Sequence, residues 1–340
     1  MNLNELNLVA NAMIGNGKGI LAADESSPTI KKRFDSIDTE STEEIRRRYR
    51  EMLFTTPGTS DFIGGVILFD ETIRQSTTAG VPFPRYLNDL GMIAGIKVDT
   101  GAKPLAGFAG ETVTEGLDGL RDRLAEYREL GARFAKWRAV INIGDGVPSD
   151  YCLRANAHAL ARYAALCQEA GIVPVVEPEV LMDGAHSIER CEEVTNDTLE
   201  ATFAELAAHR VALEGMVLKP NMVLSGTNAT NRAGASEVAA ATLKSLKAHV
   251  PPEVPGIAFL SGGQTAEEAT LHLGLMNQMG PLPWELSFSY GRALQAPALE
   301  AWRGKKENFS AGQAALIKRA RLNSLAHLGQ YEAAMEAAAA

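Results

Sequence analysis

The sequence has few cysteines, and none is arranged as a pair. Three are present among 340 residues, and no CxxC motif occurs. An odd cysteine count in a chain too long to need covalent cross-links is typical of proteins that stay in a reducing compartment. The count excludes a small disulfide-bonded scaffold and predicts a cytoplasmic protein.

The sequence also lacks long apolar runs and an excess of positive charge. No run approaches the roughly 18 apolar residues that span a membrane, and the chain does not open with a basic stretch followed by an apolar one. The 33 Lys and Arg against 42 Asp and Glu give a net charge of -9, which repels a phosphodiester backbone. We therefore expect neither a membrane nor a nucleic acid as partner.

Motifs for metals and dinucleotides are missing as well. The six histidines form no HxH or HExxH spacing, and no GxGxxG follows the first apolar run. The sequence therefore predicts no metal and no cofactor, and it offers no support for a doubly wound nucleotide-binding sheet.

The sequence does contain a repeated pattern, a short apolar run that ends in a polar or charged residue. The eight runs are Gly19–Asp24, Gly65–Asp70, Gly95–Asp99, Phe134–Arg138, Val173–Glu179, Met216–Lys219, Ile257–Ser261 and Leu286–Ser289. Apolar runs without alternation are typical of parallel strands that are covered on both faces. Helices are expected between them, with candidate capping boxes at Ser41 and Thr265.

This alternation predicts an α/β fold, a single-domain (β/α)8 TIM barrel with short terminal extensions. One domain is expected over residues 1–340, with strand-helix units from about residue 17 to about residue 300. A C-terminal helix and an Ala-rich tail would follow from about residue 310 to 340, the tail being either a fraying helix or a mobile segment. A doubly wound sheet also alternates strand and helix, and is the alternative fold.

Charged residues stand at the ends of five predicted strands. Lys136 and Arg138 share one face of their strand, and Glu177 and Glu179 share one face of the next. A single charge of this kind could simply lie at an exposed barrel rim. Several together favour an active site, because barrel interiors prefer apolar residues and barrel active sites lie at the carboxyl ends of the strands.

Lys219 is the strongest candidate for catalysis, because it ends a buried run and precedes Pro220. Burial and neighbouring cations both favour the neutral amine, which is a nucleophile able to form a Schiff base with a carbonyl substrate. With no metal motif, activation of a carbonyl would fall to this lysine. The alternative is a lysine paired with Glu177 or Glu179 for structure alone.

Two groups of residues suit phosphate. One follows the seventh and eighth runs, where barrels commonly bind phosphate; it comprises Ser261, Gly262, Gly263, Ser289, Gly291 and Arg292. The other comprises Ser26, Thr29, Lys32, Arg33 and Lys97. Two anion sites imply a substrate phosphorylated at both ends or two phosphorylated products, although the basic run that includes Lys32 could instead be a solvated helix face.

Several motifs together resemble the class I fructose-1,6-bisphosphate aldolase family over residues from about 10 to about 330. They are GKGILAADES at 17–26, GGVILFDET at 64–72, FAKWRAV at 134–140, VEPEVL at 176–181, LKPNMV at 218–223, FLSGGQ at 259–264 and FSYGRALQ at 288–295. The resemblance implies a homotetrameric lyase of glycolysis and gluconeogenesis. It would cleave fructose 1,6-bisphosphate reversibly to dihydroxyacetone phosphate and glyceraldehyde 3-phosphate.

The resemblance also implies a role for each candidate residue. Lys219 would form the Schiff base, Glu177 would exchange protons with it, and Asp24 would take the proton of the C4 hydroxyl. Lys136 would stabilise negative charge, and Glu179 would orient its neighbours. The C1 phosphate would meet the group after the seventh and eighth runs. The C6 phosphate would meet Ser26, Thr29, Lys32, Arg33 and Lys97, with Arg138 and Arg46 nearby.

The chain departs from the resemblance at its end. Animal and plant members finish with a tyrosine that assists proton exchange at the enamine, whereas this chain finishes in alanines and Tyr331 stands nine residues before the end. We expect Glu177 or a water to perform the exchange instead.

Two alternative functions are open at this point. A transaldolase or another Schiff-base lyase for a singly phosphorylated sugar would need only one anion site. A non-catalytic scaffold would be free to lose Lys219 or Glu177.

Overall fold

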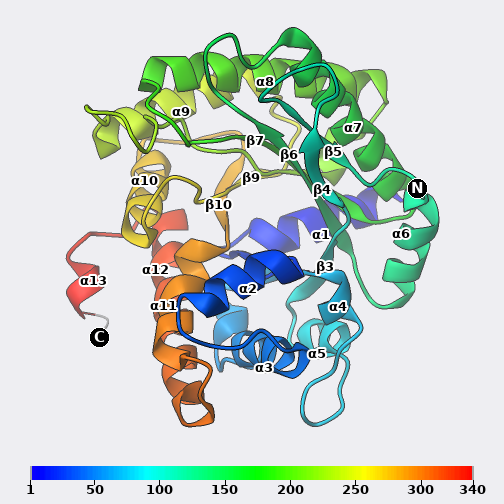
Figure 1. The fold of residues 1–340 in the computed structure, drawn as a ribbon, viewed down its shortest axis with the longest axis vertical. Helices are drawn as coiled ribbons and strands as arrows, with labels where there is room; N and C mark the ends of the chain where they lie inside the picture. Colours follow the sequence, from blue (N-terminus) through cyan, green and yellow to red (C-terminus); the bar gives the residue numbers. More distant parts are fainter. Residues whose placement is uncertain (1, 339–340) are drawn as a thin grey trace.

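Eight parallel strands close into a barrel in the computed structural model, which describes residues 2–338 (Figure 1). The barrel strands are β1 Gly19–Ala22, β2 Ile63–Leu68, β3 Ile93–Lys97, β6 Phe134–Ile141, β7 Val173–Val180, β8 Val217–Leu218, β9 Gly256–Phe259 and β10 Glu285–Tyr290. The ring is closed where β1 pairs with β10, with Ile20 opposite Ser289. The predicted (β/α)8 barrel is confirmed, each of the eight apolar runs contributes a strand, and the doubly wound sheet is wrong.

Helices surround this ring and alternate with its strands. They are α1 Leu3–Ile14, α2 Ser27–Asp35, α3 Glu43–Phe54, α4 Asp70–Ile73, α5 Phe83–Asp89, α6 Leu120–Glu129, α7 Asp150–Glu169, α8 Ile188–Ala208, α9 Ala235–His249, α10 Ala266–Gln278, α11 Arg292–Trp302, α12 Phe309–His327 and α13 Met335–Ala338. None of the helices within residues 2–338 is long and apolar enough to cross a membrane.

One of the two predicted capping boxes is present. The Thr265 hydroxyl accepts a hydrogen bond from the Glu268 N–H (3.1 Å), and the Glu268 carboxylate accepts one from the Thr265 N–H (2.9 Å), so α10 begins there. The box at Ser41 is wrong. Helix α3 is capped by Thr42, and the carboxylate of Glu44 binds the guanidinium of Arg47 instead of a backbone N–H.

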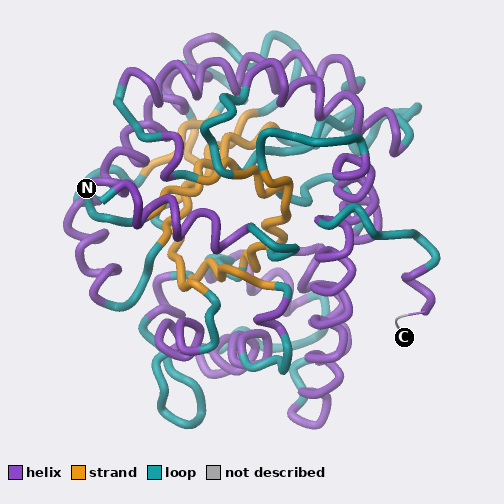
Figure 2. The backbone as a smooth tube through the Cα atoms, turned by 180° about the vertical axis from the view of Figure 1, so that it is seen from behind, coloured by secondary structure: helices purple, strands orange, loops and turns teal. Residues whose placement is uncertain are grey.

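Helix α1 lies across the amino end of the barrel (Figure 2). Its Leu6, Ala10, Met13 and Ile14 are buried against side chains that fill the barrel interior. Phe134 also belongs to this cluster. Its ring occupies the space beside Gly95, where any larger residue would clash with it. The barrel interior is therefore packed with side chains beneath the carboxyl ends of the strands.

A short antiparallel hairpin, which the sequence analysis did not predict, is inserted between β3 and α6. Its strands are β4 Gly101–Pro104 and β5 Thr112–Glu115. Arg123 of α6 holds the base of the hairpin, because its guanidinium donates to the carbonyl oxygens of Val98 (2.9 Å) and Gly116. Most residues of the hairpin strands are exposed or half-buried, so the strands form no buried apolar run.

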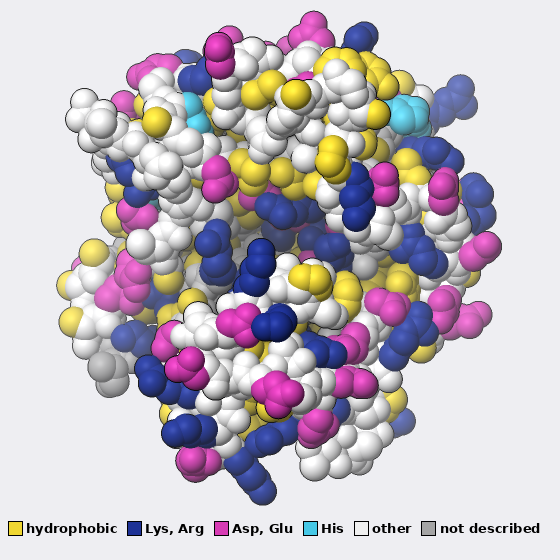
Figure 3. All heavy atoms as spheres, viewed as in Figure 1, with side chains coloured by type: hydrophobic (Ala, Val, Ile, Leu, Met, Phe, Trp, Pro, Cys, Tyr) yellow, Lys and Arg dark blue, Asp and Glu magenta, His cyan; other side chains and the backbone are white. Residues whose placement is uncertain are grey.

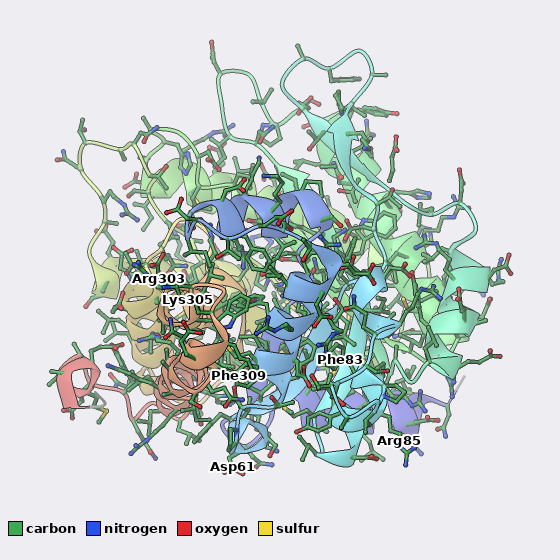
Figure 4. All side chains as sticks on the ribbon, turned by 60° about the horizontal axis from the view of Figure 1, so that its bottom comes forward. Asp61, Phe83, Arg85, Arg303, Lys305 and Phe309 are labelled. Carbon is green, nitrogen blue, oxygen red and sulfur yellow. The ribbon has the colours of Figure 1, made fainter. Side chains whose placement is uncertain are left out.

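The outer helices show the expected division between core and surface. On α5, Phe83 packs edge-on against Phe54 with a ring separation of 5.2 Å. Arg85, two residues further on, lies at the edge of the molecule (Figure 4) and pairs with the exposed Asp89. The helix therefore turns one side toward the barrel.

The C-terminal segment is held by specific contacts as far as it is described. Tyr331 is buried, and its hydroxyl donates to Glu336 at 3.0 Å. Arg319 of α12 binds the same carboxylate at 2.5 Å. Residues 335–338 form α13, and residues 339–340 of the predicted tail lie outside the described part of the chain.

Candidate active site

A cavity of about 680 Å³ opens at the carboxyl ends of the barrel strands. Lys and Arg side chains gather in a hollow at the centre of this face (Figure 3). The predicted residues that line the cavity are Asp24, Ser26, Thr29, Arg33, Lys97, Lys136, Arg138, Glu177, Glu179, Lys219, Ser261, Gly262, Ser289, Gly291 and Arg292. Residues far apart in the sequence thus meet in one place, as the barrel predicts.

Lys219 directly follows β8 and is almost fully buried. Its backbone N–H donates to the Val176 carbonyl at 2.8 Å, which fixes the chain beside β7. Its Nζ lies 3.1 Å from Oε1 of Glu177. The sequence left open cationic neighbours and a pairing with Glu177 or Glu179. The direct neighbour is Glu177, a carboxylate that can exchange a proton with the amine.

Lys136 of β6 lies between two carboxylates. Its Nζ is 2.7 Å from Oδ2 of Asp24 and 3.4 Å from Oε2 of Glu177. Two lysines and two carboxylates therefore share one buried centre, with Glu177 touching both lysines. Buried charges need such partners, because removal from water would otherwise be very costly.

The charges of this centre determine which groups are ionised. Burial by itself would raise the pKa of Asp24, but Lys136, Lys219 and Lys97 outweigh it and hold the pKa well below its usual range. Burial likewise opposes ionisation of Glu177, and the charges of Lys219, Lys136 and Arg138 lower its pKa. For Lys136, burial favours loss of the proton, but Asp24 and Glu177 raise its pKa. The centre holds two carboxylates and an ammonium at neutral pH.

Two further ion pairs frame the centre. Arg138 pairs with Glu179, and this carboxylate raises the pKa of the guanidinium against the effect of burial. Lys97, at the end of β3, binds the side chain of Asp99 and donates to its carbonyl oxygen at 2.7 Å. Asp99 also accepts the Arg138 backbone N–H at 3.3 Å, so it links β3 to β6.

The group at the carboxyl ends of β9 and β10 has an unused hydrogen-bond donor. Ser289 is 1% exposed, and its hydroxyl has no hydrogen-bond partner among residues 2–338. At Gly262 an added side chain would approach Glu179, and at Gly291 it would approach the Ala22 carbonyl. A buried hydroxyl without a partner at the cavity wall indicates a place for a ligand oxygen.

Part of the second predicted phosphate group, around Ser26 and Thr29, lies next to the first group. Ser26 and Thr29 lie at the start of α2, with their hydroxyl oxygens 3.1 Å apart. Arg33, one helical turn further on, reaches the neighbourhood of Gly291. Arg33 therefore lies between the two groups instead of belonging to one alone.

Three predicted residues do not line the cavity. Lys32 is exposed on α2. Arg46 is occupied by Glu71, through contacts of 2.8 and 2.5 Å. Gly263 has a φ of +76° and its α-carbon faces Met182, so it serves the turn after β9. Lys32 is thus a charge on the helix surface, whereas Arg46 is half-buried in an ion pair with Glu71.

The structure adds residues that the sequence analysis did not select. Glu25 is buried beside Asp24 and pairs with both Arg33 and Arg50. Asp70, at the end of β2, accepts a hydrogen bond from the Tyr127 hydroxyl at 2.8 Å. Asp70 and Asp99 end apolar runs that the sequence already showed, so position at a strand end could have identified them. Glu25 could be found only through its partners.

Comparisons with known proteins agree over nearly the whole chain. Residues 5–340 match the family described as fructose-bisphosphate aldolase class-I. A probable fructose-bisphosphate aldolase class 1 of Xylella fastidiosa is 59% identical over 333 residues, covering 98% of this chain and 100% of that protein. The cytosolic fructose-bisphosphate aldolase 4 of Arabidopsis thaliana is 53% identical over 96% of this chain and 84% of its own.

A solved structure is similar as well. The fructose-bisphosphate aldolase of Plasmodium falciparum, determined in complex with TRAP and a small-molecule inhibitor, superposes with a TM-score of 0.95. It is 49% identical in sequence, and the match covers 97% of this chain and 96% of that one.

Proposed function

The chain belongs to the class I fructose-bisphosphate aldolase family, and from that premise we propose which of its side chains carry each step of the reaction. It is a lyase of glycolysis that acts on a phosphorylated sugar, cleaving fructose 1,6-bisphosphate to dihydroxyacetone phosphate and glyceraldehyde 3-phosphate through a Schiff base. We assign the whole chain, residues 1–340, to one barrel domain that holds this site.

Lys219 is the nucleophile. Its amine adds to the C2 carbonyl of the sugar, and Glu177 accepts a proton from the lysine and returns it to the hydroxyl that leaves as water. The observation that carries this assignment is the 3.1 Å separation of Lys219 Nζ and Glu177 Oε1 at the buried end of the barrel. A general base within hydrogen-bond reach of the nucleophile is what covalent catalysis needs.

Asp24 is the base for cleavage. Its carboxylate takes the proton of the C4 hydroxyl, the C3–C4 bond breaks, and the electron pair moves into the enamine on Lys219. Because lysine charges lower the pKa of Asp24, the group is ionised before substrate binds. Lys136, whose Nζ is 2.7 Å from Asp24, stabilises the negative charge on the Asp24 carboxylate before the proton transfer and on the C4 oxygen as it loses the proton.

Glu179 acts through a neighbour. It holds the Arg138 guanidinium against β6, so that this cation keeps a fixed position at the cavity wall. The assignment of Glu179 is therefore one of positioning.

The two phosphates bind to two different parts of the cavity wall. Ser261, Gly262, Ser289 and Arg292 receive the C1 phosphate, and the unpartnered Ser289 hydroxyl supports this. Ser26, Thr29 and Lys97 receive the C6 phosphate, with Arg33 between the two. Hydroxyls, backbone N–H groups and a planar guanidinium are the donors that phosphate prefers.

The last protonation, at C3 of the enamine, falls to Glu177 or to a water that it orients. The position of Tyr331 supports this assignment. Its hydroxyl is hydrogen-bonded to Glu336, and the residue is buried and does not line the cavity, so it is not placed to protonate the enamine.

We also propose that the protein is a cytoplasmic homotetramer. The name of the Arabidopsis relative, which is cytosolic, supports the location. Sedimentation equilibrium tests the assembly, with four times the mass of one chain as the expected result and a monomer as the contrary one.

Trapping the Schiff base tests the central assignment. The enzyme is reduced with borohydride in the presence of dihydroxyacetone phosphate, and the adduct is located by peptide mass mapping. We expect the adduct on Lys219, none in Lys219→Arg, and an unchanged yield in the control Lys244→Arg, whose ammonium is exposed on α9. An adduct on another residue, or none, overturns the mechanism. Cleavage activity should not change after treatment with EDTA.

A further inference from the structure

Three side chains that can bind a metal converge on the outer helical layer, away from the cavity. His158 lies on α7, and Glu205 and His209 lie four residues apart at the end of α8. One ligand atom from each lies within 4.8 Å of the other two. Helices α7 and α8 pack against each other, so this spacing is set by the fold and not by one flexible segment.

The two imidazoles approach the same carboxylate. Nδ1 of His158 is 3.3 Å from Oε2 of Glu205, and Nδ1 of His209 is 3.5 Å from the same oxygen. The ring centroids are 4.9 Å apart, with the planes inclined by 67°. Two imidazoles and one carboxylate therefore point at a common region of space between the helices.

A backbone contact favours one form of His209. Its Nδ1 lies 2.9 Å from the carbonyl oxygen of Glu205. When Nδ1 donates to that carbonyl, the lone pair of Nε2 is left for a ligand, whereas in the other tautomer Nδ1 itself, 3.5 Å from Oε2 of Glu205, is the ligand atom. The side chain of His158 is 56% exposed, so an ion and its remaining water ligands have access.

We propose that His158, Glu205 and His209 form a binding site for a zinc-class divalent cation that joins α7 to α8. Two nitrogen ligands and one carboxylate oxygen suit zinc, whereas magnesium and calcium prefer oxygen ligands alone. Water would complete a tetrahedral shell. The site is separate from the Schiff-base chemistry, because none of its three residues lines the active-site cavity.

The site would stabilise a part of the barrel that matters for catalysis. Helix α7 follows β6, which carries Lys136, and α8 follows β7, which carries Glu177. An ion bound to both helices stabilises the folded state, because the unfolded chain does not hold these ligands together. We expect the effect in stability and not in turnover.

Titration calorimetry with zinc chloride on the full-length enzyme tests the proposal. The wild type should bind one zinc ion at this site. His158→Gln and His209→Gln should each weaken that binding by about tenfold or more, since even groups behind a metal ligand are worth about 10- to 100-fold in affinity. His249→Gln, which changes a half-buried histidine at the end of α9, is the matched control and should bind as the wild type does.

Two further measurements separate this site from other zinc binding. Cobalt(II) should give the visible absorption of a tetrahedral site in the wild type and lose it in the His158→Gln/His209→Gln double variant. Zinc should raise the melting temperature of the wild type and leave that of the double variant unchanged. Failure of the wild type to bind zinc, or equal binding by the double variant, overturns the proposal whatever the outcome of Schiff-base trapping.

Discussion

The Nζ atom of Lys136 lies 2.7 Å from Oδ2 of Asp24, in a part of the barrel where both side chains are nearly closed off from solvent. The lysine holds the aspartate as a carboxylate although burial favours the neutral acid. In the proposed mechanism Lys136 therefore keeps Asp24, the base for cleavage, ionised, and it also lies 3.4 Å from Glu177, the proposed base for Schiff-base formation.

Replacing Lys136 by Met should lower kcat about 10²- to 10³-fold, because a charge-stabilising donor is lost from a water-poor site. The pKa of Asp24 should rise when the cation is removed, so the acid limb of the kcat profile should move to higher pH. Steady-state rates between pH 3 and 8 measure both effects. The control Lys244→Met should behave as wild type, and an unmoved acid limb in Lys136→Met would contradict the proposed coupling.

Arg33 and Arg46 should differ as phosphate ligands. Arg33→Ala should raise the KM for fructose 1,6-bisphosphate about 10- to 100-fold, as expected for loss of a charge-assisted hydrogen bond. Arg46→Ala should change the KM little, because Arg46, unlike Arg33, does not line the cavity and its guanidinium pairs with Glu71. Assays of both variants on the bisphosphate and on fructose 1-phosphate check this, and a larger effect at Arg46 would reverse the assignment.

Glu25 should support the stability of the active site. Its carboxylate pairs with Arg33 and Arg50 and accepts a hydrogen bond from Gln295 at 2.9 Å. Glu25→Gln leaves a buried guanidinium without its counter-charge, which should lower the free energy of unfolding by about 3 kcal/mol at pH 7. Urea titration measures this loss, and Glu300→Gln on the exposed face of α11 is the control.

The contribution of Glu25 should also depend on pH. Burial would raise its pKa, but Arg50 and Arg33 lower it below the usual value. A carboxyl with a lowered folded pKa stabilises the fold above its unfolded pKa, and the contribution is lost as pH falls through the folded value. The difference between wild type and Glu25→Gln should therefore shrink from pH 6 toward pH 3, and a constant difference would show that ionisation of Glu25 is not involved.

The barrel interior should not tolerate even one extra methyl group at Gly95. A Cβ there would overlap the ring of Phe134, and overpacking of this kind costs about 1–3 kcal/mol. Gly95→Ala should lower stability by that amount in denaturant titrations. The double variant Gly95→Ala/Phe134→Leu should recover part of the loss, whereas additive losses would show that the two residues do not compete for space.

Truncation after Gln330 should reduce stability and leave catalysis intact. It removes the buried Tyr331 and the Glu336 partner of Arg319, so the free energy of unfolding should fall by about 2 kcal/mol or more. Exchange of tritium from water into dihydroxyacetone phosphate should persist near the wild-type rate. A large loss of exchange would assign the final proton transfer to the tail instead of to Glu177.

The fold and the centre of the site were accessible from the sequence because they depend on buried strands. Lys136 and Arg138 follow the two-residue period of β6, and Lys219 ends an apolar run, so their positions could be derived from backbone geometry. Which of Glu177 and Glu179 contacts Lys219 could not be derived, because that contact depends on the stagger of neighbouring strands. The hairpin β4–β5 was also not predicted, because its strands are short and partly exposed and contain no buried apolar run.

Partners of arginine were the least predictable part of the site. In Arg46–Arg48 each side chain has the same local sequence character, and only the fold brings Glu71 to Arg46. Glu25 is adjacent to Asp24, yet its buried pairs come from α2 and α3. Such pairs depend on long-range contacts, for which a single sequence carries no period or spacing.

Helix α1 covers the amino end of the barrel and so limits the route by which substrate and products reach and leave the site. With the amino end closed by Leu6, Ala10, Met13 and Ile14, the sugar enters and both three-carbon products leave through the mouth at the carboxyl ends of the strands. In the proposed mechanism the three-carbon ketone is still bonded to Lys219 after cleavage, so the aldehyde must depart first. In the synthetic direction the ketone must bind first, because its enamine on Lys219 has to form before the aldehyde can add. With the amino end covered by α1, both reactants reach Lys219 through the same opening.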